Sequence, residues 1–244
     1  MQTVNIAIVT GASSGVGAAT AQALLRQGVR TALVARREDR LKEVVRDAGT
    51  STRAYITAAD LTQEKEARSA MQRAMEQLGG CDALIMCHGD NIAERQLVSL
   101  TPSNWDALLA TNLSSAFYCL HAVLPDMRTQ QHGLIVSISS LAGLHPSALS
   151  GAAYSAAKAG LNALSTCINL EEAANGIRSC IIAPGDIDTE LLHRRPAPPS
   201  SQARARMLQP VDIAGLVVDI IRQPERALVE QIVVRPLPRE VTRD

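Results

Sequence analysis

The chain has 244 residues, of which 46% are hydrophobic and 20% charged, a composition typical of a globular protein with a sizeable core. Its 24 basic residues balance its 24 acidic ones, and only 2% of the residues are aromatic, so there is neither a strong positive field nor a base-stacking surface for nucleic acid. We therefore expect a single domain over residues 1–244 with no nucleic-acid partner.

Signals for targeting, membranes and metals are weak. The N-terminal residues run directly into an apolar, strand-like segment, without the basic start and small-residue cleavage site of a signal peptide. We find no uninterrupted apolar run of membrane-spanning length. The five cysteines form neither a CxxC motif nor a Cys/His spacing that binds zinc. These patterns predict a cytoplasmic protein with no membrane partner, no disulfide framework and no metal.

Short aliphatic runs alternate with segments of helical periodicity along the chain. The runs predicted as strands are residues 4–10, 30–35, 52–58, 83–87, 134–138, 178–183 and 228–234. The segments predicted as helices are residues 15–27, 39–48, 62–77, 102–128, 152–174 and 210–222. This alternation, with strands that are apolar on both faces, predicts an α/β fold: a doubly wound, seven-stranded parallel sheet with helices on both faces.

A glycine-rich turn, TGASSGVG over residues 10–17, follows the first predicted strand and opens the first predicted helix. Gly11 permits the tight turn, Gly15 lets the backbone approach a pyrophosphate, and Gly17 lets the helix pack closely against the strand. The helix N-terminus would bind the phosphates through free N–H groups. The expected contacts are Gly11, Ser13, Ser14, Gly15, Val16 and Gly17. The GxxxGxG spacing after threonine resembles the short-chain dehydrogenase/reductase family, which implies a Rossmann fold that binds a nicotinamide dinucleotide.

The end of the second predicted strand indicates which dinucleotide is preferred. A site for NAD has an acid here that accepts from the ribose 2′-hydroxyl. This chain has Ala35 where NAD-specific members of the family usually have Asp, and Arg36 and Arg37 follow. Arginine suits a 2′-phosphate, so we predict NADP as the cofactor. The alternative is that both arginines are only a solvated, basic start of the next helix.

Two further strand ends are expected to line the cofactor cleft. Asp60 follows the third strand, where it could cap the next helix. The resemblance implies instead that Asp60, next to Leu61, contacts the adenine amino group, and the residues leave both interpretations open. After the fourth strand, Met86-Cys87-His88-Gly89 replaces the family's usual NNAG. Cys87 and His88 could suggest a metal site, but without further ligands they make a poor one. We expect Cys87 and Gly89 to line the cofactor cleft instead.

Tyr154 and Lys158 form a YxxxK motif on a predicted helix, and their i, i+4 spacing places both on one helix face. A nearby ammonium favours the phenolate and lowers the tyrosine pKa from its usual value of about 10. Tyr154 is then able to donate its proton to a developing alkoxide. The motif alone is common by chance, and most helical tyrosines only pack.

Other residues strengthen the YxxxK motif. Ser140 lies at the end of the fifth predicted strand, 14 residues before Tyr154, where ligands bind in open α/β sheets. Its neighbour Ser139 is expected to be structural. Asn112 lies inside a predicted helix, where asparagine is unfavourable. Taken alone it would be structural, but the resemblance implies a catalytic tetrad of Asn112, Ser140, Tyr154 and Lys158, in which the asparagine holds a water. The interval from Ser140 to Tyr154 is one residue longer than the family pattern.

A proline-glycine turn follows the sixth predicted strand. By resemblance, Pro184, Gly185, Ile187 and Thr189 hold the nicotinamide carboxamide, although a plain turn would use the same residues. The segment at residues 186–210 is rich in proline and arginine. We interpret it as a mobile substrate lid, and a solvated loop is the equal alternative. We also expect Asp186 and His145 to approach the nicotinamide end and to favour a polar substrate.

These motifs together predict an NADP-dependent oxidoreductase that interconverts a ketone or aldehyde and an alcohol, a small-molecule substrate. The resemblance also implies a homo-oligomer, a dimer or a tetramer. One alternative is a catalytically inactive regulatory protein that binds the cofactor, against which the intact tetrad argues. Another is an epimerase or dehydratase of the extended branch, which would need a larger C-terminal substrate domain. The residues do not choose among hydroxy acids, polyketides, sugars and steroids.

Overall fold

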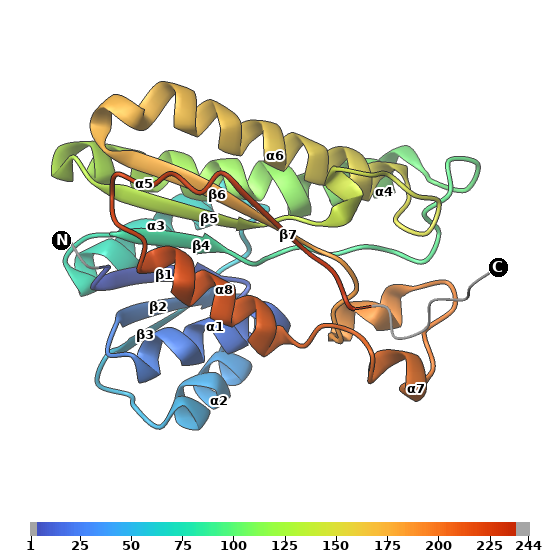
Figure 1. Ribbon diagram of the computed structural model, residues 1–244, viewed down its shortest axis with the longest axis horizontal. Helices are drawn as coiled ribbons and strands as arrows, with labels where there is room; N and C mark the ends of the chain where they lie inside the picture. The colour runs from blue at the N-terminus through green and yellow to red at the C-terminus, as the bar shows by residue number, and fades with distance from the viewer. Residues whose placement is uncertain (1–3, 238–244) are drawn as a thin grey trace.

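The computed structural model describes residues 4–237. Within them, seven strands form one sheet in which all neighbours are parallel, in the order β3-β2-β1-β4-β5-β6-β7 (Figure 1). The strands are β1 (Ile6–Thr10), β2 (Arg30–Ala35), β3 (Ala54–Ala58), β4 (Ala83–Met86), β5 (Gly133–Ile138), β6 (Ile177–Pro184) and β7 (Gln231–Val234). The predicted doubly wound α/β fold, a single Rossmann-like domain, is confirmed.

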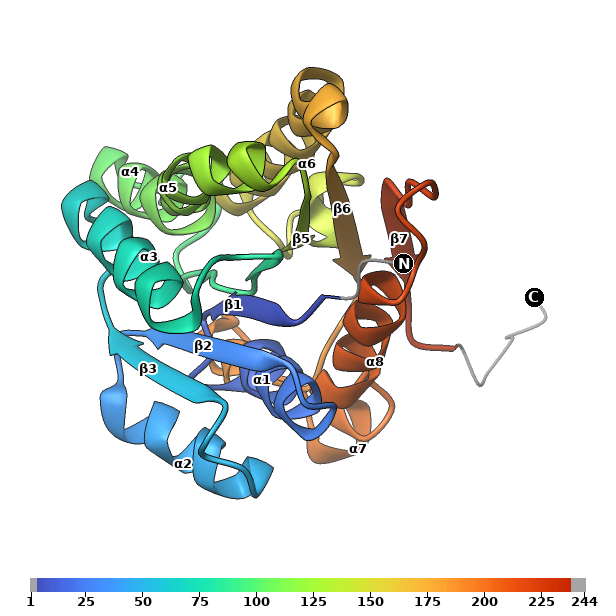
Figure 2. The ribbon, with the colours of Figure 1, turned by 90° about the vertical axis from the view of Figure 1, so that its left-hand side faces the viewer.

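Helices cover both faces of the sheet (Figure 2). They are α1 (Gly15–Arg26), α2 (Glu38–Ala48), α3 (Glu64–Leu78), α4 (Pro102–Leu109), α5 (Ser115–Gln130), α6 (Ala152–Glu172), α7 (Ser201–Arg204) and α8 (Pro210–Ile221). Helices α1, α2 and α8 pack on one face, and α3, α5 and α6 pack on the other. The chain reverses its direction of winding between β1 and β4, so the loops after these two strands diverge and leave a crevice at their carboxyl ends.

The core consists of two apolar layers, one on each side of the sheet. On β1, Ala7 and Val9 face the layer of α1 and α8, whereas Ile6 and Ile8 face the layer of α3 and α5. The inner strands are therefore buried on both faces, as their apolar sequences predict. The edge strand β7 differs, because Gln231 and Val233 are exposed.

One helical run from Pro102 to Gln130 agrees with the helix predicted over residues 102–128, but it contains a turn of a different helix type that was not predicted. The chain forms α4, then a π-helical turn at Ala110–Ser114, and then α5. The stretch from Pro102 to Gln130 is also long and apolar enough to cross a membrane by length and composition, which the sequence analysis did not find. In the structure α5 is a core helix, with Cys119, Val123 and Met127 buried against the sheet and α3.

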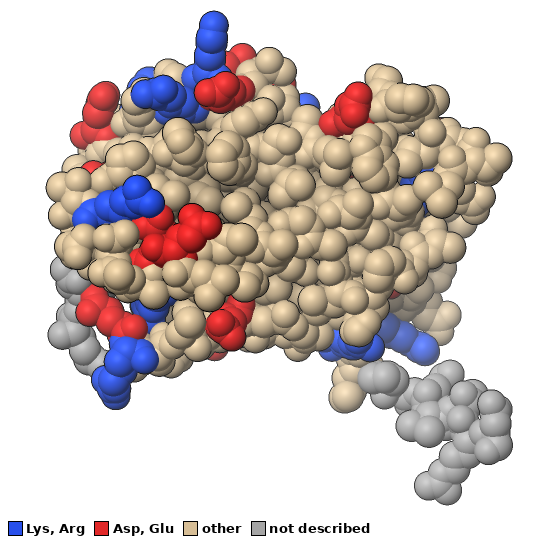
Figure 3. Space-filling view, turned by 90° about the horizontal axis from the view of Figure 1, so that it is seen from above, with Lys and Arg blue, Asp and Glu red and all other residues tan. Residues whose placement is uncertain are grey.

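The outer face of the α5 and α6 layer, seen from above, carries few charged side chains (Figure 3). Phe117 on α5 and Leu170 on α6 are exposed, with 47% and 78% of their surface open to solvent. A face of this kind on a folded domain is a typical contact surface for another protein.

The glycine-rich turn depends on two approaches of backbone to backbone. A Cβ atom on Gly17 would lie 2.3 Å from the carbonyl oxygen of Gly11, and one on Gly11 would lie 2.6 Å from the amide nitrogen of His88. Gly11 also has a φ of 66°, which L side chains rarely adopt. The turn thus packs against the start of α1 through Gly17 and against the residues after β4 through Gly11.

We expect Gly17→Ala to lower the free energy of unfolding by about 3 kcal/mol or more, because a rigid backbone carbonyl cannot yield to the added methyl group. The matched control is Gly215→Ala in α8, where an added Cβ would meet no atom within 4 Å. That variant should raise the free energy of unfolding by about 0.5 to 1 kcal/mol, since alanine is the better helix former. Urea denaturation of both variants measures the two changes, and equal effects would contradict the proposed close contact.

Candidate active site

A cleft of about 1220 Å³ lies at the carboxyl ends of β1, β2, β4, β5 and β6. It is lined by most of the residues expected from the sequence to bind the cofactor or substrate: Gly11, Ser13, Ser14, Gly15, Val16, Arg36, Arg37, Asp60, Leu61, Cys87, Gly89, Ser140, Tyr154, Lys158, Pro184, Gly185, Ile187 and Thr189. Two candidates, Gly17 and Asn112, are not part of this lining. Gly17 packs against the backbone of the turn at Gly11, and the Asn112 side chain is hydrogen-bonded to the backbone of Asp90 in the loop after β4.

The start of α1 has donors for an anion. Ser14 precedes α1 in an extended conformation and makes no side-chain cap bond, so the first N–H groups of the helix are not capped by it. A Cβ on Gly15 would lie 3.3 Å from the Cγ2 atom of Thr189. The turn after β1 and the segment after β6 therefore meet over this helix N-terminus, where a phosphate is favoured.

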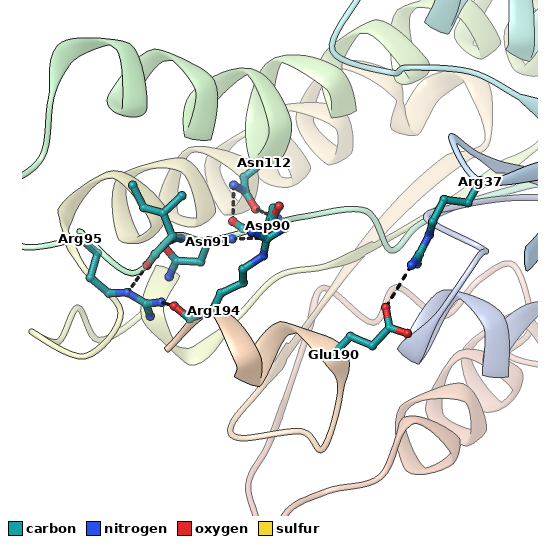
Figure 4. A network of polar contacts seen from close by, with 8 residues as sticks. Arg37, Asp90, Asn91, Arg95, Asn112, Glu190 and Arg194 are labelled. Atoms are coloured by element: carbon teal, nitrogen blue, oxygen red, sulfur yellow. Dashed lines mark hydrogen bonds and ion pairs between the residues drawn. The ribbon is translucent and has the colours of Figure 1, made fainter. Parts of the chain in front are cut away.

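The two arginines after β2 are not equivalent. Arg36 is exposed. Arg37 donates to the Ser14 hydroxyl at 2.8 Å and to the Ser13 hydroxyl at 3.2 Å, and its Nη1 atom lies 3.2 Å from a carboxylate oxygen of Glu190 (Figure 4). No pattern in the sequence points to this carboxylate, because Glu190 is 153 residues away along the chain.

The expectation that Asp60 caps the next helix is wrong. The Asp60 carboxylate accepts from the backbone N–H of Thr62 at 3.0 Å and from its hydroxyl at 2.8 Å, which closes a turn before the helix. Helix α3 begins only at Glu64, after Gln63. Asp60 lines the cleft at the edge formed by β2 and β3, so the alternative of a contact with adenine stays a prediction.

Lys158 and Tyr154 lie together on α6, as their spacing predicts. The Nζ atom of Lys158 donates to the backbone carbonyl of Ile138 at 2.9 Å and lies 5.7 Å from the centre of the Tyr154 ring. Ser140, two residues beyond Ile138, lies beside Tyr154 and acts to lower the pKa of its hydroxyl. The end of β5 therefore holds both the lysine and the partner of the tyrosine hydroxyl.

The expected lowering of the tyrosine pKa is not found. Burial raises the pKa of Tyr154, and the hydrogen bond from Ser140 and the charge of Arg95 oppose this effect only in part. Burial lowers the pKa of Lys158 itself to about 8. At neutral pH the tyrosine is thus protonated and the lysine is mostly charged.

Asn112 lies in the π-helical turn, and its side chain explains why asparagine is tolerated there. Its amide nitrogen donates to the carbonyls of Leu108 and Asp90, both at 2.9 Å, and its oxygen accepts from the Asp90 N–H at 3.1 Å. A Cβ on Gly89 would lie 2.8 Å from the Asn112 oxygen and 3.3 Å from the Lys158 ammonium. Gly89 thus allows Asn112 and Lys158 to approach the same stretch of backbone. Such π turns are frequent at functional sites.

Ser139 and His88 serve the structure around the site. The Ser139 hydroxyl is buried and lies 2.5 Å from the Asn162 side-chain oxygen, in agreement with a structural role. The Nδ1 atom of His88 lies 2.6 Å from the Thr10 hydroxyl. Burial and the nearby Lys158 lower the pKa of His88 to about 3, so its ring is neutral. This histidine ties the end of β1 to the end of β4.

Residues within the segment at 186–210 are joined to one another by ion pairs and backbone hydrogen bonds. Asp188 accepts from Arg204 at 2.7 Å, and the backbones of Asp186 and Leu208 are joined by an N–H···O bond of 3.0 Å. Asp186 also pairs with Arg195 at 2.5 Å. Asp186 and His145 both line the cleft, as expected, and so does Arg195. Neither Arg195 nor Arg95 was predicted as a site residue, because no sequence motif marks either of them.

The lowered pKa of Lys158 predicts a pH-dependent stability. Its ordinary pKa is 10.5, so between about pH 8 and 10.5 the unfolded chain binds a proton that the folded protein has lost. The free energy of unfolding contributed by this group therefore rises with pH in that window, by on the order of 3 kcal/mol. Denaturation at several pH values in this window gives the free energy of unfolding of the protein and of Lys158→Met. The difference between the two curves isolates Lys158, because the cysteines titrate in both proteins. Parallel curves for the two proteins would contradict the buried ammonium.

Comparisons with known proteins agree with this geometry. The family model for short chain dehydrogenases matches residues 5–199. An uncharacterized oxidoreductase of Staphylococcus haemolyticus is 31% identical over 232 residues, which cover 95% of this chain and 97% of the relative. Another, from Staphylococcus saprophyticus, is 31% identical over 234 residues, with the same shares covered.

Solved structures with this fold include an oxidoreductase and a reductase. A metagenomic short-chain oxidoreductase in complex with NADP is 32% identical, with a TM-score of 0.82 over 97% of this chain and 98% of the other. Levodione reductase is 25% identical, with a TM-score of 0.87 over 96% of each chain. The family match, the fold and the arrangement of the cleft together establish that this chain belongs to the short-chain dehydrogenase/reductase family of oxidoreductases.

Proposed function

We propose that the protein is an NADP-dependent oxidoreductase that interconverts a ketone or aldehyde and an alcohol. The observation that carries this proposal is that Tyr154, Ser140 and Lys158 converge in the same cleft as the glycine-rich turn. That turn fits a dinucleotide, because Gly15 presents backbone without a side chain to the cleft and the start of α1 has no side-chain cap. When bound, the nicotinamide supplies or accepts the hydride.

The chain's own residues move and hold the proton. Tyr154 donates its hydroxyl proton to the substrate oxygen, and the pKa raised by burial keeps that proton in place at neutral pH. Ser140 hydrogen-bonds the same oxygen. The Lys158 ammonium, held over the tyrosine ring, stabilises the phenolate that forms. Asn112 orders the backbone at Asp90 and, as in the family, holds a water that relays protons to Lys158.

The expected consequence of Tyr154→Phe is a loss of turnover of on the order of a hundredfold or more, because the general acid is removed. The dissociation constant for NADPH should stay the same, since the ring remains. Tyr55→Phe on β3 is the matched control and should leave both values unchanged. NADPH oxidation with a panel of carbonyl compounds gives the rates. Unchanged turnover in Tyr154→Phe would overturn the mechanism, and NADPH binding without turnover on any carbonyl would favour the regulatory alternative.

The preference for NADP rests on the residues after β2. Ala35 offers no carboxylate to a ribose 2′-hydroxyl, and Arg36 and Arg37 line the cleft beside it. A relative of known structure also binds NADP. Glu190 opposes this preference, because its carboxylate pairs with Arg37 and would lie near a 2′-phosphate.

NADPH should bind tighter than NADH by roughly tenfold to a hundredfold, the value of one good hydrogen bond to a charged group. Ala35→Asp with Arg36→Ala should reverse the preference, because the new carboxylate repels phosphate and accepts from the ribose hydroxyl. Glu190→Gln should tighten NADPH and leave NADH unchanged, because it releases Arg37. Cofactor titrations at one fixed, moderate salt concentration measure these constants. Equal affinities for the two cofactors in the unaltered protein would show that the arginines are only solvated.

The remaining parts of the proposal concern the assembly and the surroundings of the site. The segment at residues 186–210 covers the substrate end of the cleft and acts as its lid. The protein works in the cytoplasm on a small molecule and forms a homo-oligomer, a dimer or a tetramer, as in the family. The exposed Phe117 and Leu170 on the face of α5 and α6 support this assembly.

A further inference from the structure

Arg95 lies in the loop between β4 and α4, and its side chain is buried at the substrate end of the cleft. The residue is only 5% exposed and lines the cleft. Its guanidinium donates to three backbone carbonyls: Nε to Ile92 at 2.6 Å, Nη1 to Leu149 at 2.9 Å and Nη2 to Arg194 at 2.5 Å. Figure 4 shows Arg95 beside Arg194. All three partners are neutral.

The charge of Arg95 is therefore not balanced by an acid. Within the described residues 4–237, no carboxylate forms an ion pair with it. The two other arginines of this region are paired, Arg194 with Asp90 at 3.7 Å and Arg195 with Asp186 at 2.5 Å. At this end of the cleft Arg95 therefore adds a second positive charge without a counter-ion to that of Lys158. A buried charge without a counter-ion is costly, and an anion that enters the cleft would remove this cost.

Arg95 also lies next to the reacting groups. A Cβ on Gly151 would fall 2.7 Å from the Cβ atom of Arg95 and 2.7 Å from its carbonyl oxygen, so Gly151 packs directly on Arg95. Gly151 precedes α6, whose first turn carries Tyr154. The two side chains interact electrostatically, since the charge of Arg95 lowers the pKa of Tyr154. An anion on Arg95 would thus belong to the same small molecule whose carbonyl reaches Tyr154.

The unused donors of Arg95 match a carboxylate. Arginine has five N–H donors, one on Nε and two on each terminal nitrogen. Each nitrogen uses one donor on a backbone carbonyl, so each terminal nitrogen keeps one. Two donors on neighbouring nitrogens suit the two oxygens of a carboxylate. We propose that Arg95 binds the carboxylate of the substrate and that the enzyme acts on oxo acids and the corresponding hydroxy acids.

This inference rests on the proposed function, and its rival is a purely structural Arg95. The same three hydrogen bonds join the loop after β4 to the loop before α6 and to the segment that contains Arg194. If Arg95 is only structural, its removal should weaken the activity on all substrates equally. If Arg95 binds a carboxylate, its removal should weaken the activity on acids and not on their esters, so matched pairs of an acid and its ester separate the two roles.

The first experiment uses the unaltered protein. NADPH oxidation is measured with pyruvate, acetoacetate and levulinate, whose carboxylates lie at different distances from the carbonyl, and with their ethyl esters. We expect at least one acid to exceed its ester in kcat/KM by roughly tenfold to a hundredfold. Esters that are reduced as well as, or better than, every acid would overturn the inference and leave the proposed function intact.

The second experiment removes the charge. Arg95→Met should raise KM for the preferred acid by roughly tenfold to a hundredfold and leave the ester unchanged. Arg95→Lys should retain part of the preference for the acid over its ester, because lysine keeps the positive charge but lacks the paired donors of the guanidinium. Arg68→Met on α3, exposed and outside the cleft, is the control for loss of one positive charge. Equal losses on acid and ester in Arg95→Met would show that Arg95 only supports the loops.

A binding measurement separates failure of the inference from failure of the proposed function. Levulinate and ethyl levulinate are titrated calorimetrically into the protein with NADP⁺ bound, for the unaltered chain and for Arg95→Met. Levulinate binding that depends on Arg95, without turnover of any carbonyl, would support the anion site and overturn the oxidoreductase proposal. The same weak affinity for levulinate and for its ester in the unaltered chain would overturn the anion site.

Discussion

The arrangement of the cleft depends on one buried ammonium group. Lys158 is 3% exposed, and within the described chain no carboxylate pairs with it; a backbone carbonyl of β5 accepts its hydrogen bond instead. Its charge stays in place because the neighbouring His88 is neutral and the Tyr154 ring lies beneath it. Gly89 leaves the space that the ammonium and Asn112 share. The end of β5, the π turn and the start of α6 are therefore held in one fixed relation.

The segment at residues 186–210 connects the two ends of the cleft. At the cofactor end, Glu190 pairs with Arg37, and at the substrate end the Arg194 carbonyl accepts from Arg95 (Figure 4). Exposed ion pairs of this kind contribute little stability, so the contact with Arg37 opens at low cost. The buried contact with Arg95 is stronger, because its donor is charged and shielded from water.

Short-range patterns in the sequence were sufficient to predict much of the fold. Alternating apolar runs and helical periodicities predicted the parallel sheet, because burial on both faces and the helix repeat are properties of neighbouring residues. The TGASSGVG turn and the YxxxK motif could also be read directly, since each consists of residues a few positions apart. The π turn at Ala110–Ser114 was missed, because Asn112 within it bonds to Asp90, 22 residues away along the chain.

What the sequence determined by itself was the family, the layers and the list of candidate residues, all of which follow from short-range patterns and their order. The tertiary structure decided how these residues influence one another. It raised the pKa of Tyr154 by burial where the nearby lysine predicted a lower value, and it placed Glu190 against Arg37. It also brought Arg95 beside the start of α6. Burial and charge at these positions arise from segments that are far apart in the chain, so only the folded arrangement of the loops around the cleft establishes them.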